Sequence, residues 1–176
     1  MNNTDDINLK SYTMIYRIVV IIIVVISIIV ISYTAPIDIS YTYEGIKYQA
    51  GNYDGVEIVR IEIQGEYRRR IFSEFSEFEG VIKVGDKIFS NTPFYFNKYG
   101  MDSLRANDEL WGIIFQSDEF EILTIEIWEK NVSGEGHYFH RASGWYISAP
   151  CQTRDEAVEI SNMVLRKLYG DTHPIE

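Results

Sequence analysis

The chain divides into one continuous apolar run near its N-terminus and a long region in which apolar and polar positions alternate. From Ile18 to Ile31 only Ser27 is polar, and with its flanks the apolar segment Met14–Tyr33 is twenty residues long. A helix of about that length, rising about 1.5 Å per residue, crosses a hydrocarbon layer about 30 Å thick. In lipid a helix pairs its own backbone groups and an isolated strand does not, so we expect a helix despite the many Ile and Val residues. Residues 14–35 are therefore predicted to form a transmembrane anchor.

Two other interpretations of this run remain open. Its apolar core also falls within the length range of a cleaved secretory signal peptide, and a buried helix of a soluble protein is the third possibility. The residues after the run disfavour cleavage, because a cut after Ala35 places Tyr33 at the third position back and Pro36 immediately after the cut. We therefore favour an anchor that is retained.

Basic residues near the span predict its orientation. Lys10 and Arg17 precede or open the apolar run, and the next basic residue after it is Lys47. Because positive charge is retained on the cytoplasmic side, residues 1–13 are expected to be a cytoplasmic tail. The chain is then a single-pass protein of the cell membrane, with an extracytoplasmic domain over residues 36–170 and a flexible tail over 171–176.

Beyond the anchor, apolar residues recur at every second position, which is typical of half-buried strands. The pattern begins at residues 37–43, and Glu44-Gly45 is a candidate interruption. Within residues 56–64 the phase slips by one, which predicts a bulge or a strand buried on both faces. The chain is expected to turn back at Gln64-Gly65, and Gly85-Asp86 gives the clearest hairpin signal.

Further short strands are predicted between turn clusters rich in Gly, Asn and Ser. Such strands at this spacing are typical of antiparallel sheets that fold into a sandwich, a barrel or a curled meander. The fold class is therefore mainly β, or α+β by content. The additional strands are expected at residues 46–48, 94–96, 111–116, 122–128, 137–141 and 145–148.

One amphipathic helix is predicted to close the domain, over residues 154–169. It begins with a capping box, in which the hydroxyl of Thr153 and the carboxylate of Glu156 each accept a hydrogen bond from the other's free backbone amide. It ends with basic residues in its last turn and Gly170 as a stop signal. Its apolar stripe is expected to pack on the sheet.

Charge and cysteine content restrict the possible partners. The chain has 16 Lys and Arg against 26 Asp and Glu, a net charge of −10, which disfavours nucleic acid. Its single cysteine, Cys151, leaves no internal disulfide, so packing alone must hold the fold. The expected partners are the lipid bilayer through residues 14–35 and an envelope protein, a peptide or a small ligand.

Three groups of residues are candidates for a site. Arg68 and Arg70 share one face of a strand and can clamp a carboxylate or phosphate; the alternative is a solvated edge on which they pair with nearby Glu66, Glu74 and Glu77. The 13 Tyr, 9 Phe and 3 Trp exceed what a small core needs, so some are candidates for a binding surface. His137 and His140 are weak candidates for metal ligands, since positions three apart on a strand face opposite sides. The aromatic candidates for a binding surface are Tyr95, Tyr99, Trp111, Trp128, Tyr138, Trp145 and Tyr146, and of these Trp128, Tyr138 and Trp145 are the predicted ligand-binding residues.

Two segments resemble a group of small membrane-anchored proteins. VEIVRIEIQGEYRRRIFSEFSEFEGVIKVGDKIF and YISAPCQTRDEAVEI are similar to segments of uncharacterised β-rich proteins from low-GC Gram-positive bacteria. The resemblance implies an N-terminal anchor, a β-rich domain and a closing helix, and it brings no activity and no site residues. The sequence departs from that pattern at Cys151-Gln152.

Two functional hypotheses follow from these patterns. The first is a tethered, non-catalytic module that binds a ligand or partner through its aromatic and charged residues. The second is an extracytoplasmic hydrolase or ligand-processing protein with a pocket near His137 and His140 or near Arg68–Arg70. No Walker loop, dinucleotide fingerprint, GxSxG or CxxC occurs in the sequence, so no cofactor is predicted.

Overall fold

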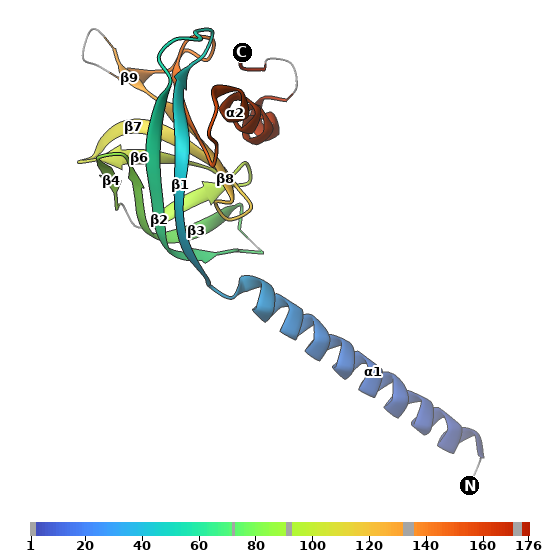
Figure 1. The fold of residues 1–176 in the computed structure, drawn as a ribbon. Helices are drawn as coiled ribbons and strands as arrows, with labels where there is room; N and C mark the ends of the chain where they lie inside the picture. The colour runs from blue at the N-terminus through green and yellow to red at the C-terminus, as the bar shows by residue number, and fades with distance from the viewer. Residues whose placement is uncertain (1–2, 72, 91–92, 132–135, 171–173) are drawn as a thin grey trace. The chain divides into compact units, whose positions relative to one another are not determined.

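The computed structural model describes residues 3–71, 73–90, 93–131, 136–170 and 174–176, with side chains from Met14 onward. The chain forms two compact units, divided between Ala35 and Pro36. The first unit is helix α1, Asn3–Thr34, and the second is a β-rich domain followed by helix α2, Arg154–Tyr169 (Figure 1). Helix α1 ends within a few residues of the C-terminal end predicted for the anchor. Helix α2 has the bounds predicted for the closing helix.

Helix α1 contains one segment that is long and apolar enough to cross a membrane. It extends from Met14 to Thr34, has a mean hydropathy of 3.2, and has no buried residue. Two of its polar side chains bond to the helix backbone: Ser27 Oγ donates to the carbonyl of Ile23 at 2.8 Å, and Thr34 Oγ1 donates to that of Val30 at 2.9 Å. An apolar surface of this extent is unfavourable in water and favourable in lipid.

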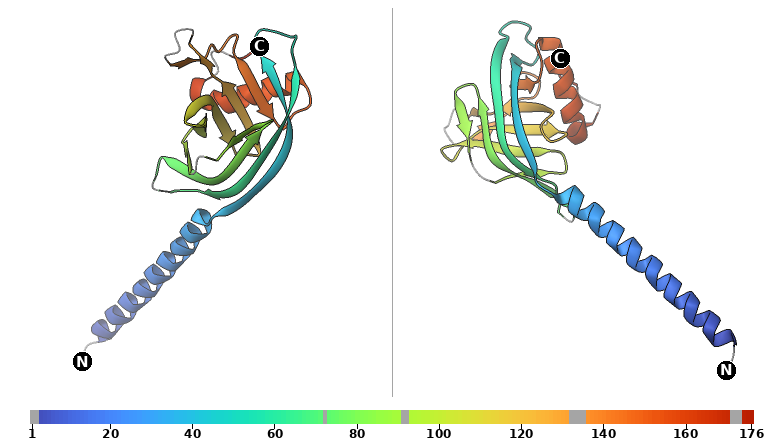
Figure 2. Two further views of the ribbon diagram at one scale, coloured as in Figure 1. Left: turned by 90° about the vertical axis from the view of Figure 1, so that its left-hand side faces the viewer. Right: turned by 60° about the horizontal axis from the view of Figure 1, so that its bottom comes forward.

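The main sheet of the second unit is antiparallel and curls into a nearly closed barrel (Figure 2), and β9 and β10 form a separate two-stranded sheet. The sheet order is β4-β3-β2-β1-β11-β8-β7-β6, and β5 pairs with β3 beside β4. Because β1 pairs with both β2 and β11, the first and last long strands of the domain join in the middle of the sheet. Of the three predicted architectures, the structure is therefore the barrel-like one. The strands are β1 Ile37–Gln49, β2 Glu57–Arg68, β3 Phe75–Val84, β4 Lys87–Phe89, β5 Phe94–Asn97, β6 Met101–Ala106, β7 Glu109–Ser117, β8 Ile122–Ile127, β9 Glu129–Lys130, β10 His137–Tyr138 and β11 Trp145–Ala149.

The interior of the barrel is filled by side chains. Alternate residues of β2 point inward, where they meet rings from β3, β4 and β5. Phe120, from the turn between β7 and β8, lies at the centre of these rings, with its own ring 4.9 Å from that of Phe78 and 5.2 Å from that of Phe96. A barrel of about eight strands is just wide enough for side chains to fill, so its interior is a packed core.

A second core lies on the outer face of the sheet, under α2 (Figure 2). Ala157, Val164 and Leu165 of the helix pack there against Tyr48 and Tyr146, whose rings stack at 5.6 Å. Buried hydroxyls satisfy one another in this layer, as Tyr48 donates to Ser161 at 2.6 Å. The predicted capping box is confirmed: Glu156 N donates to Thr153 Oγ1 at 3.3 Å, and Thr153 N donates to the Glu156 carboxylate at 3.2 Å.

The glycine-containing dipeptides on β1 and β2 do not mark turns, which corrects the sequence interpretation. Strand β1 runs unbroken through Glu44-Gly45, and β2 runs through Gln64-Gly65 to Arg68 in continuous register. Gly65 faces Gly80 of β3, and a Cβ atom on Gly65 would lie 2.3 Å from the backbone oxygen of Glu79. This glycine permits close approach of two strands. The phase slip in residues 56–64 reflects neither a bulge nor a strand buried on both faces. The start of β2 is exposed instead.

The end of the chain differs in part from the predicted flexible tail over residues 171–176. Ile175 is 5% exposed, and the side-chain amide of Asn162 brackets its backbone: Nδ2 donates to Ile175 O at 3.0 Å and Oδ1 accepts from Ile175 N at 2.7 Å. Gly51 N donates to Glu176 O at 2.9 Å. Residues 174–176 are thus packed against the domain, while the rest of the predicted tail lies outside the described residues.

Candidate functional site at the barrel mouth

One end of the barrel holds an open hollow of about 830 Å³, which we call the barrel mouth. This volume lies within the range of about 300–1,000 Å³ that is typical of small-molecule sites. The wall is apolar and the rim is charged. The wall residues are Val59, Val84, Trp111, Ile127, Trp145 and Ile147, and the rim residues with charged side chains are Lys47, Glu57, Arg60, Asp86 and Lys87.

A β-bulge in β7 positions Trp111 in the wall. Leu104 of β6 pairs with Gly112 and Arg105 pairs with Leu110, so Trp111 is the extra residue between them. Such a bulge re-aims a side chain that regular alternation would direct elsewhere. The Trp111 ring lies 5.1 Å from that of Phe89, which belongs to the packed interior. The barrel mouth is therefore closed below by the core.

Lysine side chains lie over both tryptophans of the barrel mouth. Lys47 Nζ is 5.3 Å from the ring centroid of Trp145, at the start of β11, and Lys87 Nζ is 5.8 Å from that of Trp111. These distances fall within the range of cation–π attraction. The barrel mouth thus combines flat apolar surfaces with positive charge at their edges.

The rim cations differ in their ionic partners. Lys47 Nζ is 2.8 Å from the Glu57 carboxylate, and Arg60 Nε is 2.9 Å from that of Glu62. Lys87 has no ion pair among the described residues. The nearby Glu109 is bonded to Lys130, which lowers the pKa of Glu109 more than Lys87 does.

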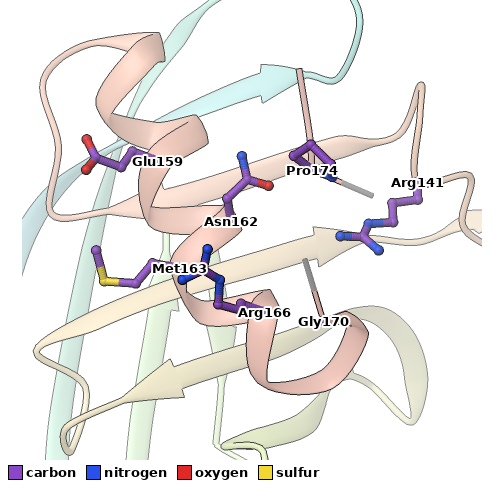
Figure 3. A pocket seen from close by; sticks show the side chains of 7 residues that line it. All are labelled: Arg141, Glu159, Asn162, Met163, Arg166, Gly170 and Pro174. Carbon is purple, nitrogen blue, oxygen red and sulfur yellow. The ribbon is translucent and has the colours of Figure 1, made fainter. Parts of the chain in front are cut away.

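A smaller hollow of about 390 Å³ lies beside α2, where the side chains of Arg141 and Asn162 point toward it (Figure 3). Nearby, Glu126 of β8 is only 2% exposed, and burial raises the pKa of its carboxyl to about 7, against the opposing effects of Arg141 and Trp128. Glu126 Oε1, Trp128 Nε1 and Arg141 Nε are buried without a hydrogen-bond partner among the described residues. Glu126 does not line the hollow, so its carboxyl is not among the groups that a ligand there would meet.

The structure separates the predicted ligand-binding residues. Trp145 lines the barrel mouth. Trp128 stacks on Phe139 with ring centroids 6.3 Å apart, and the Tyr138 hydroxyl donates to Glu129 at 2.9 Å. Arg68 is 3.0 Å from Glu66 and Arg70 pairs with Glu77, so both arginines of the predicted clamp have carboxylate partners.

The two histidines occupy different local structures. His137 lies on β10 opposite Lys130, while His140 Nδ1 is 2.9 Å from Ser143 Oγ in a turn closed by Ser143 N donating to His140 O at 3.1 Å. This turn explains the contact between His140 Nδ1 and Ser143 Oγ. Within the part of the chain that the structure describes, no three His, Cys, Asp or Glu side chains gather as a metal site.

Sequence reasoning about the site missed Lys47 and Lys87, and it named Trp111 as an aromatic candidate without its position in the wall. The signals were present only as single residues on separate strands, because the barrel mouth is assembled from seven strands that meet in space. In comparisons with protein-family models, with curated proteins and with solved structures, the chain matches none, and the geometry alone therefore carries the functional argument.

Proposed function

We propose that this chain is a membrane-tethered, non-catalytic binding module that holds a small apolar ligand in the barrel mouth, with its β-rich domain outside the cytoplasm. The observation that carries the proposal is an open hollow of about 830 Å³ walled by Trp111 and Trp145 on a filled barrel. A concave apolar surface with a few polar groups is the usual form of a small-molecule site. Helix α1 supplies the tether by its length and apolar composition.

The chemistry of the barrel mouth favours binding over reaction. Its charged side chains stand at the rim, away from the apolar wall that would hold the body of a ligand, and two of the rim cations are held in ion pairs with Glu57 and Glu62. General acid–base or nucleophilic catalysis needs a titratable or nucleophilic group within hydrogen-bond reach of the reacting atom. The same surface needs only desolvation and ring contact to retain an apolar molecule.

Removal of the Trp145 ring is expected to weaken ligand binding about tenfold, because a buried aromatic contact contributes more than about 1 kcal/mol. The full chain in phosphatidylcholine vesicles serves as the sample, with Trp128→Phe as the background. Since the chain has 3 Trp, this background leaves the two tryptophans of the barrel mouth as reporters. The probes are 1-octanol, octanoate and octylammonium, and the readout is tryptophan emission.

The control variant for this prediction is Tyr138→Ala, which removes an exposed aromatic ring outside the barrel mouth. Vesicles without protein correct for partitioning of the probes. A saturable change in emission that Trp145→Ala weakens and Tyr138→Ala leaves intact supports the proposal. The absence of a saturable change with all three probes contradicts it.

The proposed orientation predicts that a cysteine at position 53 reacts from outside the cell. Tyr53 is 75% exposed, whereas Cys151 is 6% exposed and burial raises the pKa of its thiol to about 11, which keeps it unreactive. Tyr53→Cys is therefore expected to be labelled by a membrane-impermeant maleimide on intact expressing cells, and the parent chain is not. Labelling of Tyr53→Cys only after cell lysis contradicts the orientation.

A further inference from the structure

We propose that the ligand of the barrel mouth is an amphiphile with a single apolar body and one anionic head group, and that Lys87 binds the head. This inference rests on the proposed function and adds the chemical class of the ligand. Its basis is the geometry of the wall, the charge of the rim and the arrangement of Lys87 over Trp111.

The filled interior determines how far a ligand enters. Phe89 is fully buried and contacts the Trp111 ring from the core side, so the barrel mouth ends at that level. A ligand body therefore lies among the wall side chains, and any polar group that it carries stays at the rim. This geometry suits a molecule with an apolar end and a polar end, since burial of a polar group without partners is costly.

The charge of the rim favours an anionic head. Three cations and two anions line the barrel mouth, although the chain as a whole carries a net charge of −10. Glu57 is already paired with Lys47, and Asp86 lies in the exposed turn of the β3–β4 hairpin. Lys87 is the rim cation without an ion pair among the described residues, and its ammonium lies over a wall ring. A carboxylate or similar head at the rim would complete its pairing.

The flat wall and the lysine act on different parts of the ligand. Trp111 and Trp145 can contact the apolar body of a ligand whatever the charge of its head group. Lys87 discriminates between head groups of different charge. Loss of the Lys87 charge should therefore lower the affinity for an anionic ligand and leave that for a neutral one unchanged. A general loss of the fold would lower both.

The experiment uses the full chain with Trp128→Phe in zwitterionic phosphatidylcholine vesicles at pH 7.5, with three probes that share an eight-carbon chain. Octanoate, 1-octanol and octylammonium carry a negative, neutral and positive head. Octanoate is expected to bind at least about fivefold more tightly than octylammonium, as one partly exposed ion pair is worth about that factor. Lys87→Met keeps most of the aliphatic stem and should weaken octanoate about fivefold.

Two variants make the test specific. Lys98→Met removes a lysine that also lies over an aromatic ring, Tyr99 at 5.0 Å, but does not line the barrel mouth, and it should change no affinity. Asp86→Asn removes a rim anion and should leave octanoate binding unchanged or strengthen it. Tighter binding of octylammonium, or an unchanged octanoate affinity in Lys87→Met, overturns the anionic class while the binding function stands. Absence of saturable binding by every probe overturns both.

Discussion

Replacement of Phe120 by alanine is expected to lower the free energy of unfolding of the β-rich domain by about 3–5 kcal/mol. Phe120 is fully buried and its ring contacts those of Tyr67, Phe78 and Phe96. Its backbone is also held, as Phe120 N donates to Gln116 Oε1 at 3.1 Å. A packed barrel cannot close around the cavity that the lost ring leaves, so both transfer energy and ring contacts are lost.

Urea unfolding of the full chain in vesicles, followed by near-UV circular dichroism, measures this loss. Phe75→Ala is the matched control, because Phe75 lies on β3 but is 46% exposed, and it should cost less than about 1 kcal/mol. Phe120→Leu should lie between the two. Similar midpoints for Phe120→Ala and Phe75→Ala would show that the Phe120 ring is not central to the core.

Glu126 is expected to make the stability of the domain fall as the pH rises. Burial raises the pKa of its carboxyl from 4.5 to about 7, so between these values the folded state keeps a proton that the unfolded state has released. Stability that is present below pH 4.5 is therefore lost as the pH rises to about 7, by about 3 kcal/mol in total. Glu126→Gln should remove this dependence and leave the variant more stable than the parent at pH 8.

Unfolding free energies at intervals between pH 4.5 and 8 measure this dependence. Among the described residues, the charged and titratable groups that act on Glu126 are Arg141, Tyr146 and Tyr169, and burial raises the pKa of both tyrosines, so the two tyrosines stay neutral in this window. Glu159→Gln is the control, as its carboxylate is exposed on α2. An equal pH slope in the parent and in Glu126→Gln would exclude Glu126 as its source.

The parts of the fold that local patterns specify were predictable from the sequence. The closing helix was predicted because its capping box and its final Gly170 are local signals. The hairpin was predicted because Gly85-Asp86 lies between two apolar runs, and the structure confirms it with Gly85 at a positive φ of 57°. Strand β6 was missed because Leu104 is its only buried residue, so it lacks the alternation that marks a strand. Gly65 was interpreted as part of a turn, but a glycine is needed there because the neighbouring strand approaches closely, and no local pattern reveals that approach.

The candidate site was less predictable than the fold. Trp145 was singled out for its residue type, but the same reasoning selected Trp128, which stacks on Phe139 instead. The position of Trp111 depends on a bulge, and a bulge is a property of two paired strands. The pairing of the arginine run with nearby carboxylates was an alternative visible in the sequence, and Arg68–Glu66 and Arg70–Glu77 bear it out. The partner of Arg69 is Glu119, 50 positions away, which no local pattern reveals.

The place of β1 in the sheet has a mechanical consequence for a tethered protein. A pull on the anchor passes along the backbone to Ile37, which is the first residue of the ladder between β1 and β2 and pairs with Tyr67. Because β1 lies between β2 and β11, this pull must open that ladder pair by pair before it reaches Lys47, at the other end, where the barrel mouth lies. In the proposed tethered module, the proposed ligand site thus lies at the end of this strand pair that is farther along the chain from the anchor.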